Sequence, residues 1–230
     1  MTLPGRIYCS LLYFGFHLLY NEMAWTYDTV SWLVSLGQWR DWGRSGISHL
    51  AGPRVLELAF GTGDILLDLH AAGFQAFGLD LSPFMVSIAR RKLNRAHGCV
   101  PLTRGAAAAL PFADTSFDSI ILTFPTPFVF EERVLEEIAR VLRPGGRLVI
   151  VGRGMVQRPA LVARFIEWLY VVTGQRPSEA SSLTGRLRVA GWNAEEVESR
   201  LPRSTVGMVV AWLGSARTDG QSDASCGALP

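Results

Sequence analysis

The chain has 230 residues, a length that suits one domain with a substantial hydrophobic core. Its formal net charge is only +2, with 22 basic residues against 20 acidic ones. The chain as a whole therefore lacks the strong positive field of nucleic-acid-binding proteins. The 3 cysteines stand far apart, without C-x-x-C or metal-ligand spacing, which argues against a disulfide framework or a zinc site and for a reducing cytoplasm.

The first element in chain order is an aromatic, uncharged stretch from Ile7 to Tyr20. It is shorter than the roughly 20 apolar residues that span a membrane, and no small-residue cleavage site of a signal peptide follows it. Such a helix can pack in the core, cap a pocket or lie in a membrane interface, and all three alternatives stay open. His17 lies within it and is a candidate general base.

After this stretch, apolar residues recur at helical spacing, among them Trp25, Trp32 and Trp39. Gly37 interrupts the pattern and predicts a break between two helices. We therefore expect residues 1–50 to form an N-terminal helical lid.

The most informative segment reads V-L-E-L-A-F-G-T-G-D over residues 55–64. Its apolar start predicts a strand, and Gly61 and Gly63 predict a sharp turn that a ligand can approach closely. The helix expected to start at Asp64 would present its free N–H groups to that turn. The spacing matches neither G-x-G-x-x-G nor the phosphate-binding pattern G-x-x-x-x-G-K-[ST]. Glu57 lies near the carboxyl end of the strand, where open α/β sheets bind their ligands.

A second strand, predicted over Phe74 to Leu79, ends in Asp80, about 20 residues after the glycine turn. An acid at this spacing is placed to accept hydrogen bonds from the ribose hydroxyls of an adenosine ligand. Ser82 and Pro83 then predict the start of a helix, as its N-cap and first-turn residue.

The remaining predicted elements continue the alternation of buried strands and amphipathic helices. They are a strand over 117–123, a helix stopped by Pro144 and Gly145, a strand over 147–151, helices near 159–173 and 179–190, and a hairpin of strands over 193–199 and 205–212. The tail over 214–230 is small, polar and aperiodic, which predicts disorder.

The strand with Glu57, the glycine turn and Asp80 together resemble class I S-adenosylmethionine-dependent methyltransferases. The N-terminal region extends the likeness to the ubiquinone/menaquinone biosynthesis C-methyltransferase family, which has an aromatic and a small residue, Tyr-Asp, a short helix, a glycine and a tryptophan before the first strand. The matching positions are Met23, Ala24, Tyr27, Asp28, Ser35, Gly37 and Trp42. The likeness is good over about residues 20–152 and weak beyond them.

The resemblance implies an α/β fold, a Rossmann-like, doubly wound seven-stranded sheet with six parallel strands and one antiparallel, over residues 51–213, with an N-terminal helical cap. S-adenosylmethionine would be the cofactor, and no metal is implied. The segment around Tyr27 and Asp28 would fold over the cofactor, which makes these residues and His17 the candidate catalytic residues. The implied cofactor-binding residues are Glu57, Ala59, Phe60, Gly61, Thr62, Gly63, Asp80, Leu81, Ser82, Met85, Ala106, Ala107 and Thr123.

Three departures limit the resemblance. Ala59 replaces a glycine that many relatives have in the turn, where one extra methyl group is tolerable. Ala106 stands where relatives often place the Asp or Asn that contacts the adenine amino group. Thr123 to Phe128 read T-F-P-T-P-F, whereas the quinone enzymes continue with F-G-L-R-N. The arginine and asparagine linked to acceptor activation are missing, and we do not carry quinone C-methylation over.

The sequence thus predicts an S-adenosylmethionine-dependent methyltransferase for a small, lipophilic acceptor: a lipid, a quinone-like compound or an aromatic metabolite. An apolar loop with the hydroxyls of Thr123 and Thr126 suits such an acceptor better than a charged one. One alternative is a phospholipid amine N-methyltransferase at the membrane surface. Another is a cofactor-binding regulatory or partner protein without turnover. We expect a cytoplasmic protein with no nucleic-acid partner, and peripheral contact with the inner face of the membrane if the N-terminal helix lies there.

Overall fold

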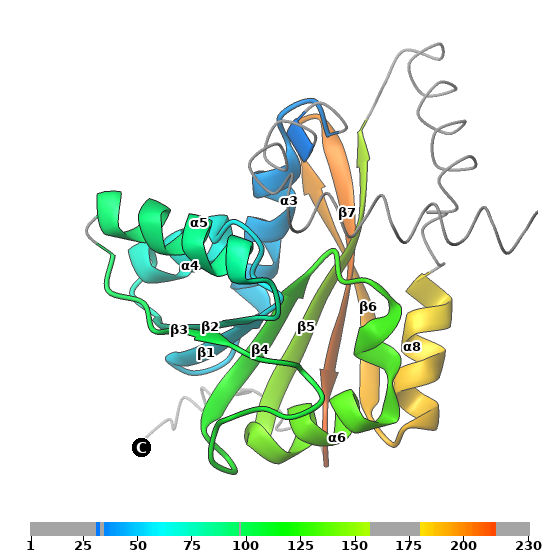
Figure 1. Cartoon of the computed structure of the whole chain (residues 1–230). Helices are drawn as coiled ribbons and strands as arrows, with labels where there is room; N and C mark the ends of the chain where they lie inside the picture. The colour runs from blue at the N-terminus through cyan, green and yellow to red at the C-terminus, as the bar shows by residue number, and fades with distance from the viewer. Residues whose placement is uncertain (1–30, 33–34, 97, 157–179, 215–230) are drawn as a thin grey trace, which may run out of the picture.

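The computed structural model describes residues 31–32, 35–96, 98–156 and 180–214. Their centre is one sheet of 7 strands in the order β3-β2-β1-β4-β5-β7-β6. Helices cover both faces of this sheet (Figure 1). The fold is therefore the doubly wound α/β arrangement that the sequence predicts.

Six of the seven strands lie where the sequence predicts them, although β5 is longer than predicted, and β3 was not predicted. Their bounds are β1 Arg54–Leu58, β2 Gln75–Asp80, β3 Leu102–Arg104, β4 Phe117–Thr123, β5 Leu142–Val156, β6 Asn193–Leu201 and β7 Ser204–Trp212. The helices are α3 Trp39–Ser45, α4 Asp64–Ala71, α5 Pro83–Arg95, α6 Glu132–Val141 and α8 Ala180–Val189, with 3-10 turns η2 Gly46–His49 and η3 Pro127–Phe130.

Strand directions agree with the prediction of six parallel strands and one antiparallel. The pairs β1 to β2, β1 to β4, β2 to β3 and β4 to β5 are parallel. β7 runs antiparallel to both of its neighbours, so β6 points the same way as β5. Pro202 and Arg203 alone connect β6 to β7, which confirms the closing hairpin.

Two hydrophobic clusters fill the two faces of the sheet. On one face, α3, α4 and α5 pack through residues such as Trp42, Leu66 and Ala89. On the other face, α6 and α8 pack through residues such as Ile138 and Leu187. Because β1 and β4 are covered on both sides, their near-continuous apolar sequences are the expected ones.

The predicted boundary between α6 and β5 is wrong by several residues. The helix ends at Val141, before Pro144, and Leu142 already pairs with Phe117. Register then shifts, so that Ser119 pairs with Arg147, and Gly145 adopts a φ of +76° in the intervening bulge. The helix thus ends ahead of Pro144 as predicted, but β5 begins before residue 147, and proline and glycine lie in an irregularity of this strand.

Helix α3 is fixed onto the sheet by Trp42, which is 2% exposed. Its Nε1 donates a hydrogen bond to Ser204 Oγ at 2.9 Å. A Cβ at Gly154 would lie 2.3 Å from the indole ring, so the ring packs directly on the backbone of β5. As a result, the residues of α3 that precede Trp42 lie beside the carboxyl ends of the central strands.

Several predictions fall outside the described residues. These are the segment from Ile7 to Tyr20 with His17, the lid residues Tyr27 and Asp28, the helix near 159–173, and the tail beyond Gly214. Within the described ranges, no helix is long and apolar enough to cross a membrane.

Candidate cofactor-binding site

The glycine turn lies at the carboxyl end of β1, between β1 and α4. Its neighbours in the sheet are β2 on one side and β4 on the other, so the chain winds away in both directions from this point. A crevice outside such a switch of strand order is the usual ligand site of an open α/β sheet. The Ala59 amide donates to the Leu79 carbonyl at 2.8 Å, which ties the start of the turn to β2.

The two glycines of the turn have different surroundings. Gly61 has a φ of +56°, and a Cβ there would meet no atom within 4 Å. Gly63 has a φ of +82°, and a Cβ there would lie 2.8 Å from the Cβ of Ala89 on α5. Gly61 therefore faces open space that a ligand can occupy, whereas Gly63 allows α4 and α5 to pack closely.

Asp80 holds the glycine turn from the end of β2. Its Oδ2 accepts a hydrogen bond from the Gly61 amide at 2.9 Å, and its Oδ1 accepts one from the Ser82 amide at 2.8 Å. Burial raises the pKa of this carboxyl, and the backbone hydrogen bonds oppose that shift. Each carboxylate oxygen keeps a second acceptor site, so the group is still able to bind hydroxyls of a ligand.

Ser82 caps helix α5 as the sequence predicts. Its hydroxyl accepts a hydrogen bond from the Met85 amide at 3.3 Å, and Pro83 occupies the first helical turn. Met85 is 1% exposed, while Leu81 is 66% exposed. Leu81 thus offers an apolar surface next to Asp80, and Met85 faces the interior.

Glu57 is buried without compensation. It is 1% exposed, and neither carboxylate oxygen has a hydrogen-bond partner among the described residues. Burial raises its pKa well above the usual range, and the nearby carboxylates of Asp80, Asp64 and Asp68 raise it further; the Leu66 amide opposes this shift, although its geometry falls short of a hydrogen bond. A buried carboxyl without a partner is costly, so this group is prepared for a cation or a hydrogen-bond donor.

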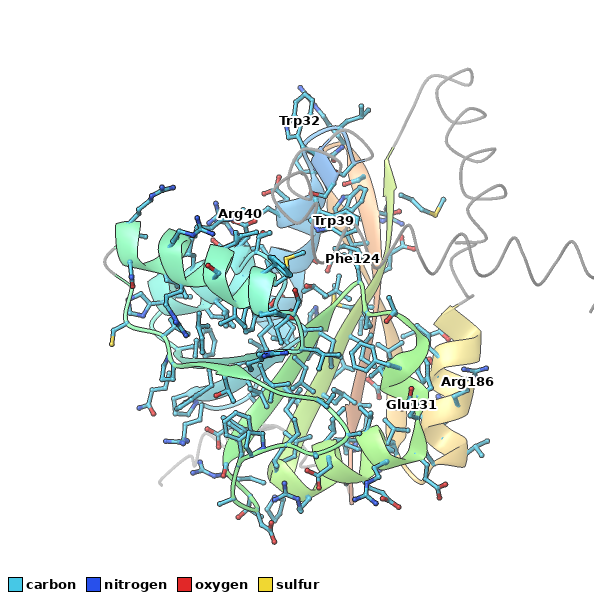
Figure 2. All side chains as sticks on the ribbon, viewed as in Figure 1. Trp32, Trp39, Arg40, Phe124, Glu131 and Arg186 are labelled. Carbon is cyan, nitrogen blue, oxygen red and sulfur yellow. The ribbon has the colours of Figure 1, made fainter. Side chains whose placement is uncertain are left out.

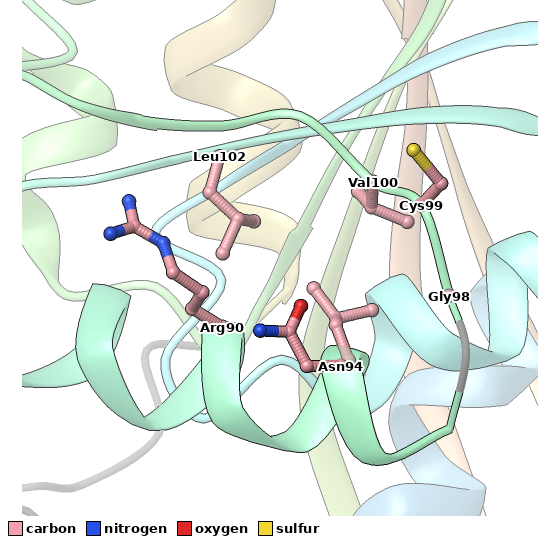
Figure 3. A pocket seen from close by; sticks show the side chains of 7 residues that line it. Arg90, Asn94, Gly98, Cys99, Val100 and Leu102 are labelled. Carbon is pink, nitrogen blue, oxygen red and sulfur yellow. The ribbon is translucent and has the colours of Figure 1, made fainter.

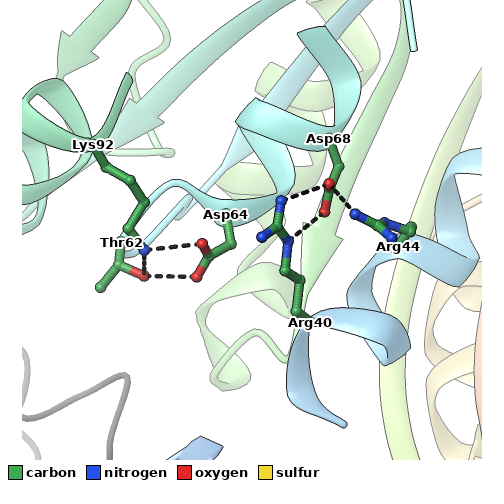
Figure 4. Close-up of polar contacts among 6 residues, drawn as sticks. All are labelled: Arg40, Arg44, Thr62, Asp64, Asp68 and Lys92. Carbon is green, nitrogen blue, oxygen red and sulfur yellow. Dashed lines mark hydrogen bonds and ion pairs between the residues drawn. The ribbon is translucent and has the colours of Figure 1, made fainter. Parts of the chain in front are cut away.

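Lys92, the only lysine of the chain, fixes the outer side of the turn. Its Nζ lies 2.9 Å from Asp64 Oδ1 and 3.2 Å from Thr62 Oγ1 (Figure 4). Thr62 Oγ1 is also 3.3 Å from Asp64 Oδ2. This cluster ties α5 to the first residue of α4 and occupies the Asp64 carboxylate.

Two arginines of α3 meet one carboxylate of α4. Arg40 binds Asp68 through Nε at 3.0 Å and Nη2 at 2.8 Å, and Arg44 also donates to Asp68 (Figure 4). Burial alone would raise the pKa of Asp68, but the hydrogen bonds and charges of the two arginines outweigh it and lower the pKa. The contact fixes α3 beside the glycine turn.

An aromatic pair forms the wall opposite the turn. The rings of Trp39 and Phe124 stack with centroids 4.1 Å apart, and Figure 2 shows them together where α3 meets the end of β4. Phe124 has a φ of +50°, which is unusual for a bulky residue, and its amide donates to the Val151 carbonyl at 2.7 Å. Strain of this kind is typical of functional sites.

These groups surround one hollow, which we call the turn pocket. The sequence predicted half of the residues that line it. They are Glu57, Ala59, Phe60, Gly61, Thr62 and Thr123. Sequence reasoning did not assign the other half to the site. These are Trp39, Arg40, Gly43, Asp64, Ile65 and Phe124.

The sequence holds signals for two of the residues that were not assigned to the site, Arg40 and Phe124. Arg40 and Arg44 are four residues apart and so share one face of a helix, opposite an acid on the next helix. Phe124 follows a buried strand directly, at the ligand-binding edge of the sheet.

Ala106 and Ala107 do not line the turn pocket, but their loop begins beside it. The Gly105 amide donates to the Asp80 carbonyl at 3.1 Å. Further on, Glu137 on α6 accepts a hydrogen bond from the Leu110 amide at 2.6 Å. The loop is thus held near the expected adenine position, although Ala106 offers no polar side chain there.

A second hollow lies between α5 and β3, lined by Arg90, Asn94, Cys99 and Leu102 among others (Figure 3). Leu102 is the first residue of β3, so this hollow is at the amino ends of the strands. That is the wrong edge of the sheet for a cofactor.

Ala59 requires a correction. The departure matters through the backbone, because Ala59 has a φ of +56°. The effect of this departure is therefore backbone strain in a conformation that glycine adopts freely.

The strand order, the glycine turn and the acid at the end of β2 define a class I S-adenosylmethionine-dependent methyltransferase domain. A solved protein from Methanococcus maripaludis, described as a candidate S-adenosylmethionine-dependent methyltransferase, has the same fold, with a TM-score of 0.61 at 15% identity over 86% of this chain and 96% of the other. A model of the ubiE/COQ5 methyltransferase family matches residues 15–178. The chain belongs to this family, and the predicted class and cofactor are confirmed.

Curated relatives carry the name demethylmenaquinone methyltransferase. The protein from Thermus thermophilus is 39% identical over 139 residues, which are 58% of this chain and 63% of the relative. The protein from Mycobacterium sp. (strain KMS) is 37% identical over 155 residues, 66% of this chain and 65% of the relative. The chain spans slightly less than two thirds of the length of each.

Proposed function

We propose that the protein transfers a methyl group from S-adenosylmethionine to a small, lipophilic acceptor. The observation that carries the proposal is the Glu57 carboxyl, which is buried and without a partner in the described residues beside the open space over Gly61. The ammonium group of an amino-acid tail would supply the missing donor and charge. Asp80, already fixed by two backbone amides, would accept the ribose hydroxyls.

The cofactor supplies an activated methyl group, so the chain has to position the acceptor and exclude water. Positioning of two reactants supplies up to roughly 7 to 11 kcal/mol of barrier reduction. Trp39 and Phe124 present an aromatic wall to the turn pocket, and Thr123 adds a hydroxyl beside it. Such a wall favours an apolar acceptor and keeps water from the reacting methyl group.

The relatives' names support a lipophilic ring as the acceptor class, since demethylmenaquinone is such a compound. The loop after β4 argues for a different acceptor within that class. It continues through Pro125 to Pro127, without the arginine and asparagine that the quinone enzymes have there. We therefore propose a lipid, a quinone-like compound or an aromatic metabolite, and not menaquinone methylation itself.

The test is incubation with isotopically labelled S-adenosylmethionine and separate acceptors: a demethylmenaquinone analogue, phosphatidylethanolamine vesicles and a host lipid extract. We expect label in a lipophilic product of the extract, identified by mass spectrometry. Label in phosphatidylethanolamine alone would favour the phospholipid amine alternative. Cofactor binding without label in any arm would favour a non-catalytic binding protein.

The catalytic roles of Tyr27, Asp28 and His17, a lid over residues 1–50 and a catalytic domain over 51–213 also remain proposals. So do a cytoplasmic location and peripheral contact with the membrane. The two arginines of α3 support the lid, since they fix the end of that segment against α4. Flotation of the full chain and of a variant without residues 1–20 on anionic vesicles would test membrane contact.

A further inference from the structure

Arg40 has a place in the turn pocket that neither its contact with Asp68 nor the packing of α3 accounts for. It lines the pocket together with Gly61 and Thr62. Its Nε and Nη2 are both bound to Asp68. In Figure 4, its third nitrogen, Nη1, lies on the side of Thr62 and Asp64, and in the described part of the chain it has no hydrogen-bond acceptor.

The two acids that act most strongly on Arg40, Asp68 and Asp64, also have other basic partners. Arg40 and Arg44 share the single carboxylate of Asp68, so this group of three keeps one positive charge. Asp64 and Asp41 are the other acids near Arg40, and Asp64 is already paired with Lys92 at 2.9 Å. Nη1 of Arg40 therefore remains at the pocket wall as an N–H donor with no acceptor among the residues that the structure describes.

The turn pocket thus combines two complementary features. Glu57 is a buried carboxyl without a donor among the described residues, and Arg40 is a guanidinium with an unused donor. An α-amino acid carries an ammonium group and a carboxylate on one carbon atom, and a pocket with a carboxyl group and a guanidinium group suits such a tail.

We propose that Arg40 is the residue that binds the carboxylate of the cofactor's methionine tail. The inference rests on the proposed function and goes beyond it, because it assigns a contact to a residue of the lid region. Arg40 keeps its bidentate contact with Asp68, which orients the guanidinium plane, and donates from Nη1 to the ligand. Arg44 does not line the pocket and only helps to hold Asp68 in place.

The contribution of a guanidinium to carboxylate binding is large enough to measure. A charge-assisted hydrogen bond is about twice as strong as a neutral one. For a half-exposed arginine, with 47% of its side chain accessible, we expect a loss of about tenfold in affinity when it is removed.

The test compares two ligands that differ in the amino-acid tail: S-adenosylhomocysteine, which has it, and 5′-methylthioadenosine, which lacks it. Calorimetry on the full chain would measure both affinities for wild type, Arg40→Gln, Arg40→Lys and the matched control Arg44→Gln. We expect Arg40→Gln to weaken S-adenosylhomocysteine about tenfold and 5′-methylthioadenosine less than about twofold. Arg40→Lys should recover part of the loss, and Arg44→Gln should leave the ratio of the two affinities unchanged.

Equal weakening of both ligands by Arg40→Gln would overturn the proposal, because it would show that Arg40 only fixes α3. The same selective loss in Arg44→Gln would overturn it as well. Should Arg40→Gln fail to fold, the carboxamide of S-adenosylhomocysteine gives a second measure on wild type and Arg40→Lys. Wild type should prefer the acid over the amide about tenfold, and a lack of preference would refute the contact. Failure of wild type to bind either nucleoside would instead refute the proposed function.

Discussion

The two walls of the turn pocket are held in place by different kinds of contact. On the side of the glycine turn, backbone amides of Gly61 and Ser82 bind Asp80, and the buried strands β1 and β2 leave little freedom. On the side of α3, long side chains make the contacts: Arg40 and Arg44 reach Asp68. The first wall is fixed before a ligand arrives, whereas the second depends on side chains that can share or exchange partners.

This difference suggests a division of work between the two walls. A rigid wall of backbone atoms suits a cofactor that is the same in every turnover. Trp39 and Phe124 of the other wall are helix and loop residues, which vary more readily than strand ends. Acceptor choice is therefore expected to depend on the second wall.

The largest expected effect is on stability, and it distinguishes the two glycines of the turn, Gly61 and Gly63, in the backbone wall of the pocket. In Gly63→Ala, the new Cβ would meet Ala89 at 2.8 Å in a left-handed backbone conformation. Overpacking costs about 1 to 3 kcal/mol and the strained backbone about 1 kcal/mol more, so the free energy of unfolding should fall by about 2 to 4 kcal/mol. Chemical denaturation followed by circular dichroism would measure the change.

Gly61→Ala is the matched control for this variant. It has a similar φ but open space around the Cβ, so its loss of stability should be near the 1 kcal/mol of backbone strain. Its loss of cofactor affinity should be the larger effect, because the methyl group enters the ligand space. Equal destabilisation by both substitutions would contradict the assignment of Gly63 to packing and Gly61 to binding.

The second effect concerns Asp80. Asp80→Ala removes the acceptor of the Gly61 and Ser82 amides together with the expected ribose contact. We expect cofactor affinity to fall about 10- to 100-fold in calorimetry, corresponding to the roughly 1.5 to 3 kcal/mol of a charged hydrogen bond. Asp80→Asn keeps one oxygen acceptor, so its cofactor affinity should lie between those of wild type and Asp80→Ala. Wild-type affinity in both variants would exclude a role of Asp80 in cofactor binding.

The rigid wall could be predicted from the sequence because its signals are local. A strand, two glycines and an acid after the next strand lie within residues 55–80 and have one structural solution. The second wall depends on how α3 packs, which Trp42, Gly154 and Ser204 decide across a long sequence separation. No periodicity in the sequence links those three residues, so Arg40 and Phe124 were not placed at the site.

The edge strand β3 and the bulge in β5 were also not predicted, because local sequence signals do not determine them. β3 has only 3 residues, too few for an alternating pattern to be recognised. The start of β5 at Leu142 follows from its pairing with Phe117, a tertiary contact for which the local sequence has no signal.

The third effect tests the unpartnered carboxyl through pH. The raised pKa of Glu57 means that the folded protein keeps a proton that the unfolded chain loses. From the usual value of 4.5 upwards, towards the raised pKa, stability should therefore fall with pH by up to about 1.4 kcal/mol per unit. Glu57→Gln lacks this contribution, so denaturation at several pH values should give a flatter profile above pH 4.5 than for wild type.

The proton on the Glu57 carboxyl also allows cofactor binding to be tested by measuring proton release. If an ammonium group of the cofactor pairs with Glu57, the carboxyl ionises and binding releases a proton. Calorimetry in buffers of different ionisation enthalpy would detect that release in wild type but not in Glu57→Gln. Identical profiles for the two proteins would show that Glu57 does not titrate on binding.

The smallest effect concerns the one residue of the rigid wall that departs from the family pattern. Ala59 adopts a φ of +56°, a conformation that costs a residue with a Cβ about 1 to 2 kcal/mol. Ala59→Gly removes that strain, but glycine adds freedom to the unfolded chain, which offsets about 0.4 to 1 kcal/mol. A net gain of about 0.5 kcal/mol in the free energy of unfolding is expected, with unchanged affinity for 5′-methylthioadenosine. Glycine keeps the backbone amide that binds Leu79 at 2.8 Å, so a loss of stability would mean that the freedom glycine adds to the unfolded chain outweighs the strain it removes.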